Sequence, residues 1–138
     1  MKQVDKILIV DDDLTSTFLV QILLEDLQVA THIATATNGK EALEFIDAHC
    51  LATESNGTQP RVAFCPELIL LDINMPVMDG FEFLEACRQK HCFKEQQVKV
   101  VMLSSSSAAG DLQKAQSYGV ADYLVKPLTE EKLLGIMS

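Results

Sequence analysis

Three features are missing from this sequence, and each absence argues against a class of protein. The net charge is −9 and the sequence contains no block of Lys or Arg. Both features argue against direct binding to nucleic acid or to an anionic membrane. No apolar run approaches the roughly 20 residues that a membrane-spanning helix needs, and the first residues contain no apolar signal-peptide core. We therefore expect a cytoplasmic protein that makes no membrane contact.

Cysteines are few and irregularly spaced. The four cysteines form no Cys-x-x-Cys pair, which without a signal peptide predicts reduced thiols. A Zn²⁺ site would have to come from predicted helix ends and from a long polar loop at 51–67, using His49, Cys50, Cys65, His91 and Cys92. The irregular spacing of these residues argues against such a site.

The apolar residues that are present suffice for one folded domain. The 138 residues are 48% hydrophobic and 22% charged, as is typical of globular chains. The sequence contains no internal repeat, no linker and no low-complexity tract beyond four consecutive serines. Residues 1–138 are therefore expected to form a single domain.

Strand and helix patterns alternate five times along the chain. Short aliphatic runs at 7–10 and 68–71 predict strands, and alternating β-branched residues at 32–37 predict another. Residues 98–103 and 122–125 are predicted as the fourth and fifth strands. Apolar residues at helical spacings predict helices between them, the first through Phe18, Leu19, Ile22, Leu23 and Leu27. This alternation predicts an α/β fold with a parallel sheet covered by helices on both faces.

Polar side chains stand at the ends of four predicted strands. Asp11 and Asp12 follow the first strand, Asp72 ends the third, Ser104 follows the fourth and Lys126 follows the fifth. The carboxyl ends of parallel strands meet at one edge of a sheet, where open α/β sheets bind ligands. These five side chains should therefore converge.

The predicted cluster of three carboxylates requires a cation. Two such charges ~4 Å apart repel by ~1–4 kcal/mol, and oxygen ligands without nearby His or Cys favour Mg²⁺ over Zn²⁺. With the ammonium group of Lys126 and the hydroxyl of Ser104, the set is suited to a phosphoryl group. Transfer of that group depends on positioning and charge neutralisation.

In combination, these motifs resemble the receiver domain of two-component response regulators, from Lys6 to about Leu134. They are the acidic pair, Asp-x-Asn-Met-Pro-x-Met-Asp-Gly at 72–80, the hydroxyl after the fourth strand and the Lys-Pro pair at 126–127. The resemblance implies a flavodoxin-like, CheY-like fold with a doubly wound five-stranded parallel sheet of order 2-1-3-4-5. It also implies a cis peptide bond before Pro127. The long loop at 51–67 departs from the family pattern.

The resemblance assigns the acceptor and the metal ligands. It makes Asp72 the phosphoacceptor and implies that Mg²⁺ is bound by Asp11, Asp12, Asp72 and the backbone carbonyl of Asn74. The chain would then be a phosphoacceptor signalling domain that catalyses only its own phosphorylation and dephosphorylation.

The resemblance also assigns a switch and partners. Lys126 would contact the phosphoryl group, and Ser104 and Tyr123 would move on phosphorylation. The donor would be a histidine kinase or a histidine phosphotransfer protein. The surface of the fourth helix, the fifth strand and the last helix would then carry the signal to an effector or to a second copy of the chain. We favour a stand-alone domain over a fragment that precedes an output domain.

A rival function uses two of the same residues. Asp11 to Thr15 also fit the Asp-x-Asp-x-Thr motif of haloacid-dehalogenase-like phosphohydrolases, with Asp11 as nucleophile and Asp13 as acid. Against it, 138 residues leave little room for a substrate cap, and the motif after the third strand would have no role. In the receiver interpretation Asp13 only begins the first helix. A receiver reduced to a binding module is disfavoured, because no site residue is missing.

Overall fold

Strands and helices alternate along the chain as the hydrophobic pattern predicted. The computed structural model describes residues 4–50, 66–88, 98–105 and 109–137. The strands are β1 Val4–Val10, β2 Ala30–Ala36, β3 Leu68–Asp72, β4 Lys99–Ser104 and β5 Asp122–Val125. The helices are α1 Leu14–Leu27, α2 Gly39–Cys50, α3 Gly80–Cys87, α5 Ala109–Ser117 and α6 Glu130–Met137. The fourth and last helices of the prediction are thus α5 and α6.

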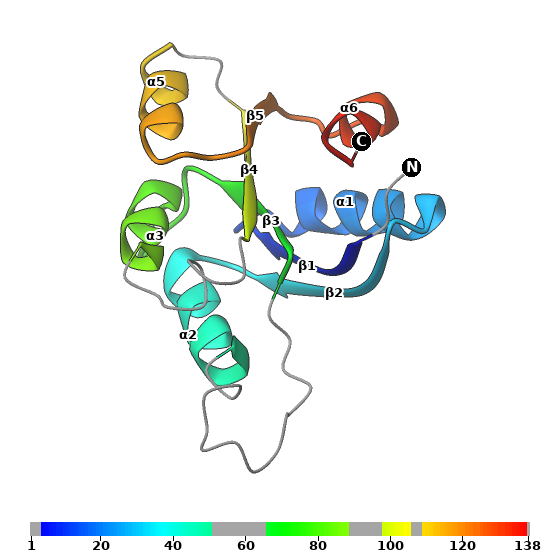
Figure 1. Ribbon diagram of the computed structural model, residues 1–138, viewed down its shortest axis with the longest axis horizontal. Coiled ribbons are helices and arrows are strands. Elements are labelled where there is room, and N and C mark those ends of the chain that lie inside the picture. The colour runs from blue at the N-terminus through cyan, green and yellow to red at the C-terminus, as the bar shows by residue number, and fades with distance from the viewer. Residues whose placement is uncertain (1–3, 51–65, 89–97, 106–108, 138) are drawn as a thin grey trace.

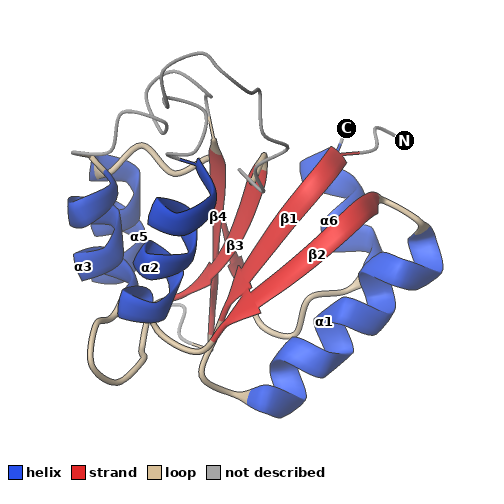
Figure 2. Cartoon of the chain, turned by 90° about the horizontal axis from the view of Figure 1, so that it is seen from below, coloured by secondary structure: helices blue, strands red, loops and turns tan. Residues whose placement is uncertain are grey.

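The described strands form one parallel sheet in the order β2-β1-β3-β4-β5. Figures 1 and 2 show α1 and α6 on one face of this sheet and α2, α3 and α5 on the other. The doubly wound α/β fold and its strand order are therefore confirmed. The order reverses between β1 and β3, and such a switch point is where open α/β sheets bind ligands.

Alternate residues of the central strands enter two separate cores. Leu8 and Val10 of β1 pack in the core beneath α2, α3 and α5. Ile7 and Ile9 pack in the core beneath α1 and α6. Because helices cover both faces, β3 is buried along its whole length. The end of β3 is therefore held by packing from both sides.

The helix α1 is present as predicted, and of the five apolar residues that indicated it, Leu23 and Leu27 pack against the core beneath α1 and α6. The other three, Phe18, Leu19 and Ile22, are 61%, 57% and 37% exposed, whereas Val20 and Leu24 are buried. Apolar residues occupy much of the circumference of α1. Helical periodicity therefore could not identify the face that meets the sheet.

Several predictions fall on residues outside the described part of the chain. Cys65, His91 and Cys92 lie there, as do residues 51–65 of the long loop, and the side chains of His49 and Cys50 are likewise not described. The argument against a Zn²⁺ site thus stays a prediction. Among the described helices, none has the length and apolar character needed to cross a membrane.

Candidate functional site

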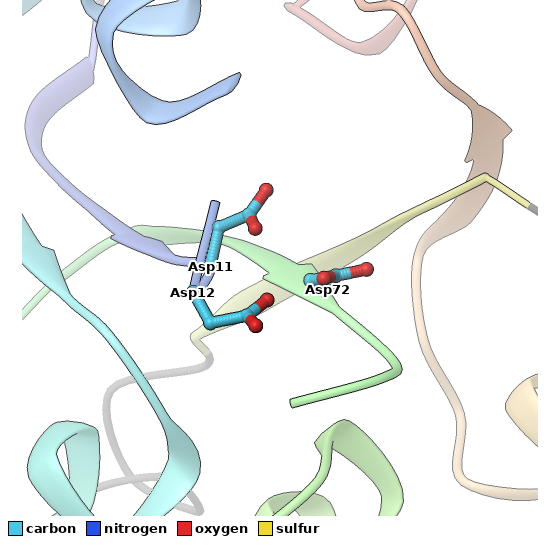
Figure 3. Close-up of side chains that lie close together, drawn as sticks. All are labelled: Asp11, Asp12 and Asp72. Carbon is cyan, nitrogen blue, oxygen red and sulfur yellow. The ribbon is translucent and has the colours of Figure 1, made fainter. Parts of the chain in front are cut away.

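The carboxylates of Asp11, Asp12 and Asp72 lie together at the carboxyl edge of the sheet (Figure 3). Asp11 directly follows β1 and Asp72 is the last residue of β3, the two strands at the switch point. One oxygen from each carboxylate lies within 4.8 Å of the other two. Asp11 and Asp72 are buried, whereas Asp12 is exposed. The structure thus brings together the three acids that were predicted to converge.

Lys126 reaches the same edge from the loop that follows β5. Its Nζ lies 2.7 Å from Oδ2 of Asp11 and 3.7 Å from Oδ2 of Asp72. The peptide bond between Lys126 and Pro127 is cis, as predicted. The N–H of Lys126 donates to the backbone oxygen of Ser104 at 2.7 Å, which ties the loop to the end of β4.

Backbone N–H groups orient the two buried carboxylates. The N–H of Asp13 donates to Oδ1 of Asp11 at 2.9 Å, and the N–H of Ile73 donates to Oδ1 of Asp72 at 2.9 Å. In both residues the other oxygen, Oδ2, is the one nearest to Lys126. A backbone hydrogen bond therefore fixes one oxygen of each carboxylate, and the other oxygen faces Lys126.

Burial raises the pKa of Asp72 from 3.8 to about 6, and the negative charges of Asp11 and Asp12 act in the same direction while Lys126 opposes them. For Lys126, burial lowers the pKa. The hydrogen bond and charge of Asp11, with the charges of Asp72 and Asp13, outweigh burial and raise the pKa above its ordinary value. The site therefore holds an excess of negative charge that a bound cation would relieve.

The donor set fits a hard divalent cation. All three side chains offer carboxylate oxygens, which Mg²⁺ prefers, and opposite ligands around Mg²⁺ lie roughly 4.2 Å apart. The three oxygens lie within 4.8 Å of one another, which is close to this separation. Asn74, the predicted fourth ligand through its carbonyl, lies exposed in the loop after β3.

The loop between β3 and α3 turns back tightly onto Asp72. The N–H of Gly80 donates to the backbone oxygen of Ile73 at 2.8 Å, and a Cβ on Gly80 would overlap the backbone oxygen of Asp72. Asp79 accepts the N–H of Glu82 at 2.8 Å, and Glu82 accepts the N–H of Asp79 at 2.9 Å, which caps α3. The Asp-Gly pair of the motif thus holds this loop against the site.

The two predicted switch residues lie on neighbouring strands. Ser104, the last residue of β4, is fully buried and stands opposite Val125 of β5. Tyr123 stands opposite Met102 and is half-buried against the core beneath α2, α3 and α5. Ser104 and Tyr123 are thus on β4 and β5, the two strands that follow β3 in the sheet order. Their movement on phosphorylation stays a prediction.

Asp13 has a structural role at the start of α1. It is exposed, and its Oδ1 accepts the N–H of Thr15 at 3.0 Å and that of Ser16 at 3.3 Å. This is the helix-start role expected in the receiver interpretation. A carboxylate engaged as a helix cap is poorly placed to serve as the acid of a phosphohydrolase, and that alternative is not supported.

Together these features define a doubly wound α/β protein with an acidic ligand site and a lysine at its switch point. The chain belongs to the response regulator receiver domain family, whose model matches residues 7–138. The receiver interpretation made from the sequence motifs is therefore confirmed.

Individual relatives agree with this assignment. The probable methanogenesis regulatory protein FilR2 of Methanothrix harundinacea is 32% identical over 127 residues, which are 92% of this chain and 75% of FilR2. The signal transduction histidine-protein kinase BarA of Escherichia coli K12 is 32% identical over 133 residues, which are 95% of this chain and 12% of BarA. The structure of the phosphorylated cyanobacterial phytochrome response regulator RcpA is 28% identical with a TM-score of 0.72, and the match covers 96% of this chain and 88% of RcpA.

Proposed function

We propose that this receiver domain accepts a phosphoryl group on Asp72 from the phosphohistidine of a histidine kinase or a histidine phosphotransfer protein. The observation that carries this proposal is the oriented Asp72 carboxylate, whose Oδ2 faces Lys126 at 3.7 Å beside two further acids. The similar protein RcpA has been solved in a phosphorylated form, which agrees with this chemistry.

Phosphoryl transfer to Asp72 needs only one new covalent bond to the protein. A carboxylate oxygen of Asp72 forms a bond to phosphorus as the N–P bond of the donor breaks, and the imidazole leaves with the bonding electron pair. Bound Mg²⁺, held by Asp11, Asp12, Asp72 and the carbonyl of Asn74, would supply charge neutralisation. Lys126 adds a fixed positive charge beside the incoming phosphoryl oxygens. Its ammonium lies nearer to Asp11 than to Asp72, so we expect it to shift toward the phosphoryl group.

The exposed side of α1 supports a docking role beside the site. Leu14, Phe18 and Ile22 recur every four residues and therefore form one ridge, and they are 71%, 61% and 37% exposed. This ridge begins beside the acidic cluster, since α1 starts just after it in the chain. Next to it, a groove of about 330 Å³ separates α1 from Pro127 and Leu128 of the loop that carries Lys126.

The charge of this region indicates which partner fits. Residues 7–39 contain five acids and no Lys or Arg. A second copy of the chain docked there would bring acids against acids, whereas a donor helix with an apolar face and basic flanks would be attracted. We therefore propose that the phosphodonor docks on the α1 ridge.

Phosphorylation then changes the surface of α5, β5 and α6. A phosphoryl group adds roughly −1.5 to −2 charge, and we propose that the buried Ser104 hydroxyl turns to donate to it. Tyr123, half-buried on β5, would then pack more deeply. The altered surface would bind a downstream effector or a second copy of the chain.

Labelling with a small phosphodonor tests the acceptor. Acetyl phosphate with Mg²⁺ should add one phosphoryl group per chain, and peptide mapping after borohydride trapping should place it on Asp72. Asp72→Asn should stay unlabelled, whereas Asp122→Asn, which alters an exposed acid on β5, should label normally. A label on Asp11 or Asp13, or full labelling of Asp72→Asn, would contradict the proposal, as would continuous turnover of the phosphodonor in place of a single label.

Comparison of two donors tests the docking surface. Phe18→Ala should leave the acetyl phosphate rate unchanged but slow transfer from a phosphorylated histidine kinase about tenfold, because interface anchors of this kind cost 1 kcal/mol or more when truncated. Leu112→Ala, which removes a comparably exposed apolar side chain from α5, is the control and should leave both rates unchanged. Equal slowing with both donors would show that Phe18 acts on the site and not on docking.

A further inference from the structure

The loop that presents Lys126 is held on its outer side by a second lysine. Nζ of Lys132 donates to the backbone oxygen of Val125 at 2.6 Å and to that of Pro127 at 3.2 Å. These two oxygens belong to the residues immediately before and after Lys126. We propose that Lys132 is a positioning residue for phosphoryl acceptance at Asp72 and that it acts through Lys126. This inference rests on the proposed function.

Lys132 lies at the end of α6 where a positive charge is unfavourable, and its two bonds to the loop offset this. Lys132 is in the first turn of α6, where its own N–H donates to Oγ1 of Thr129 at 3.2 Å. The positive end of the helix dipole disfavours a cation there and favours acids such as Glu130 and Glu131, which share the turn. The ammonium group is stabilised by reaching back to two carbonyl oxygens of the preceding loop, which accept charge-assisted hydrogen bonds.

The loop that carries Lys126 is attached on two sides, to β4 and to α6. The N–H of Lys126 donates to the backbone oxygen of Ser104 at 2.7 Å, which fixes the loop to β4. The next residue, Pro127, has no N–H with which to continue that attachment. The bonds from Lys132 fix the loop to α6. The backbone of Lys126 is thereby held between a strand and a helix, and from there its Nζ reaches to within 3.7 Å of Asp72.

Loss of this anchor should affect the chemistry more than the fold. A misplacement of about 1 Å in a catalytic group can slow a reaction by about 100-fold. The two carbonyls lie in an exposed part of the chain, where water can replace the lost donor. Removal of the Lys132 ammonium should therefore slow phosphorylation while the thermal melting of the protein changes little.

Rates of Asp72 labelling by acetyl phosphate with Mg²⁺, followed by intact mass, test this role. We expect Lys132→Met and Lys132→Gln to lower the rate, the former by about tenfold. Lys132→Arg keeps donors for two carbonyls and should restore the rate to within about twofold of wild type. In a Lys126→Ala background, Lys132→Met should have no further effect, because the residue through which it acts is absent.

Lys99→Met is the matched control. Nζ of Lys99 donates to the backbone oxygen of Ile136 at 2.8 Å, in the last turn of the same helix. Its replacement removes the same charge and the same kind of bond from the opposite end of α6. The labelling rate of Lys99→Met should equal that of wild type.

Three results would overturn the positioning role: an unchanged rate in Lys132→Met, an equal loss in Lys99→Met, and a loss that persists in the Lys126→Ala background. The last two would show an effect of stability or of overall charge. Absence of Asp72 labelling in wild type would instead overturn the proposed function. If Lys132→Met does not fold, as judged by circular dichroism, the rates of Lys132→Gln and Lys132→Arg decide in the same way.

Discussion

Replacement of Asp72 by Asn should stabilise the metal-free protein, and the gain should depend on pH. Burial, with the charge of Asp11, raises the pKa of Asp72 from 3.8 to about 6 in the folded protein. Between these two values the folded state binds more protons than the unfolded state. The stability that Asp72 contributes is therefore complete below pH 3.8 and is lost as the pH rises through about 6.

The size of the effect follows from that difference in pKa. The rise in the pKa of Asp72 from 3.8 to about 6 corresponds to about 3 kcal/mol in the free energy of unfolding. Because Asp72 is only 8% exposed, solvent screening reduces this value little. Asn has nearly the same shape, carries no charge, and can still accept the N–H of Ile73, which lies 2.9 Å from Oδ1. The variant should match wild type near pH ~4 and exceed it by about 3 kcal/mol near pH ~8.

Urea unfolding in the presence of a chelator, followed by circular dichroism across this pH range, measures the difference. Asp122→Asn is the control, because Asp122 accepts the N–H of Tyr123 at 2.8 Å in the same way but is exposed. It should change the free energy of unfolding by less than about 0.5 kcal/mol at every pH. Burial of a charged Asp72 would be refuted as the cause if Asp72→Asn gained nothing near pH ~8, or gained equally at both ends of the range.

Three further predictions concern the metal, the switch and the loop after β3. Asp12→Ala should abolish Mg²⁺ binding in calorimetry, and phosphorylation with it. It should not lower the free energy of unfolding, because an exposed like charge is removed; a loss above about 2 kcal/mol would show a structural role. Ser104→Ala should still be phosphorylated, but the amide chemical shifts of α5 should respond less than in wild type, because a hydrogen bond worth about 1.5–3 kcal/mol is lost; equal responses would contradict the switch. Gly80→Ala should lower the free energy of unfolding by about 2 kcal/mol or more, because its Cβ would overlap the backbone oxygen of Asp72. Gly135→Ala, where a Cβ meets nothing within 4 Å, should raise it by up to about 1 kcal/mol; denaturant unfolding of both variants checks this pair.

The sequence by itself determined the alternation of elements and the position of the acids along the chain. A strand buried on both faces must be apolar throughout, so β3 could be located from its short aliphatic run. The residue that ends such a run must lie at the carboxyl edge of the sheet, which placed Asp72 at the site before any contact was known. The strand order and the cis Pro127 came from the resemblance to a family, since local patterns do not record which strands are neighbours.

Only the tertiary structure decided which side of α1 meets the sheet and which groups hold Lys126. Hydrophobic periodicity describes a helix's own faces, and α1 is apolar on both its buried and its exposed side, so the pattern could not show that Phe18 lies on the exposed side. The contact between Lys126 and Asp11 joins residues 115 positions apart, and no local pattern specifies such a distance. No motif in the sequence marked Lys132. Its bonds to Val125 and Pro127 depend on the course of the loop between β5 and α6, which the sequence pattern did not specify.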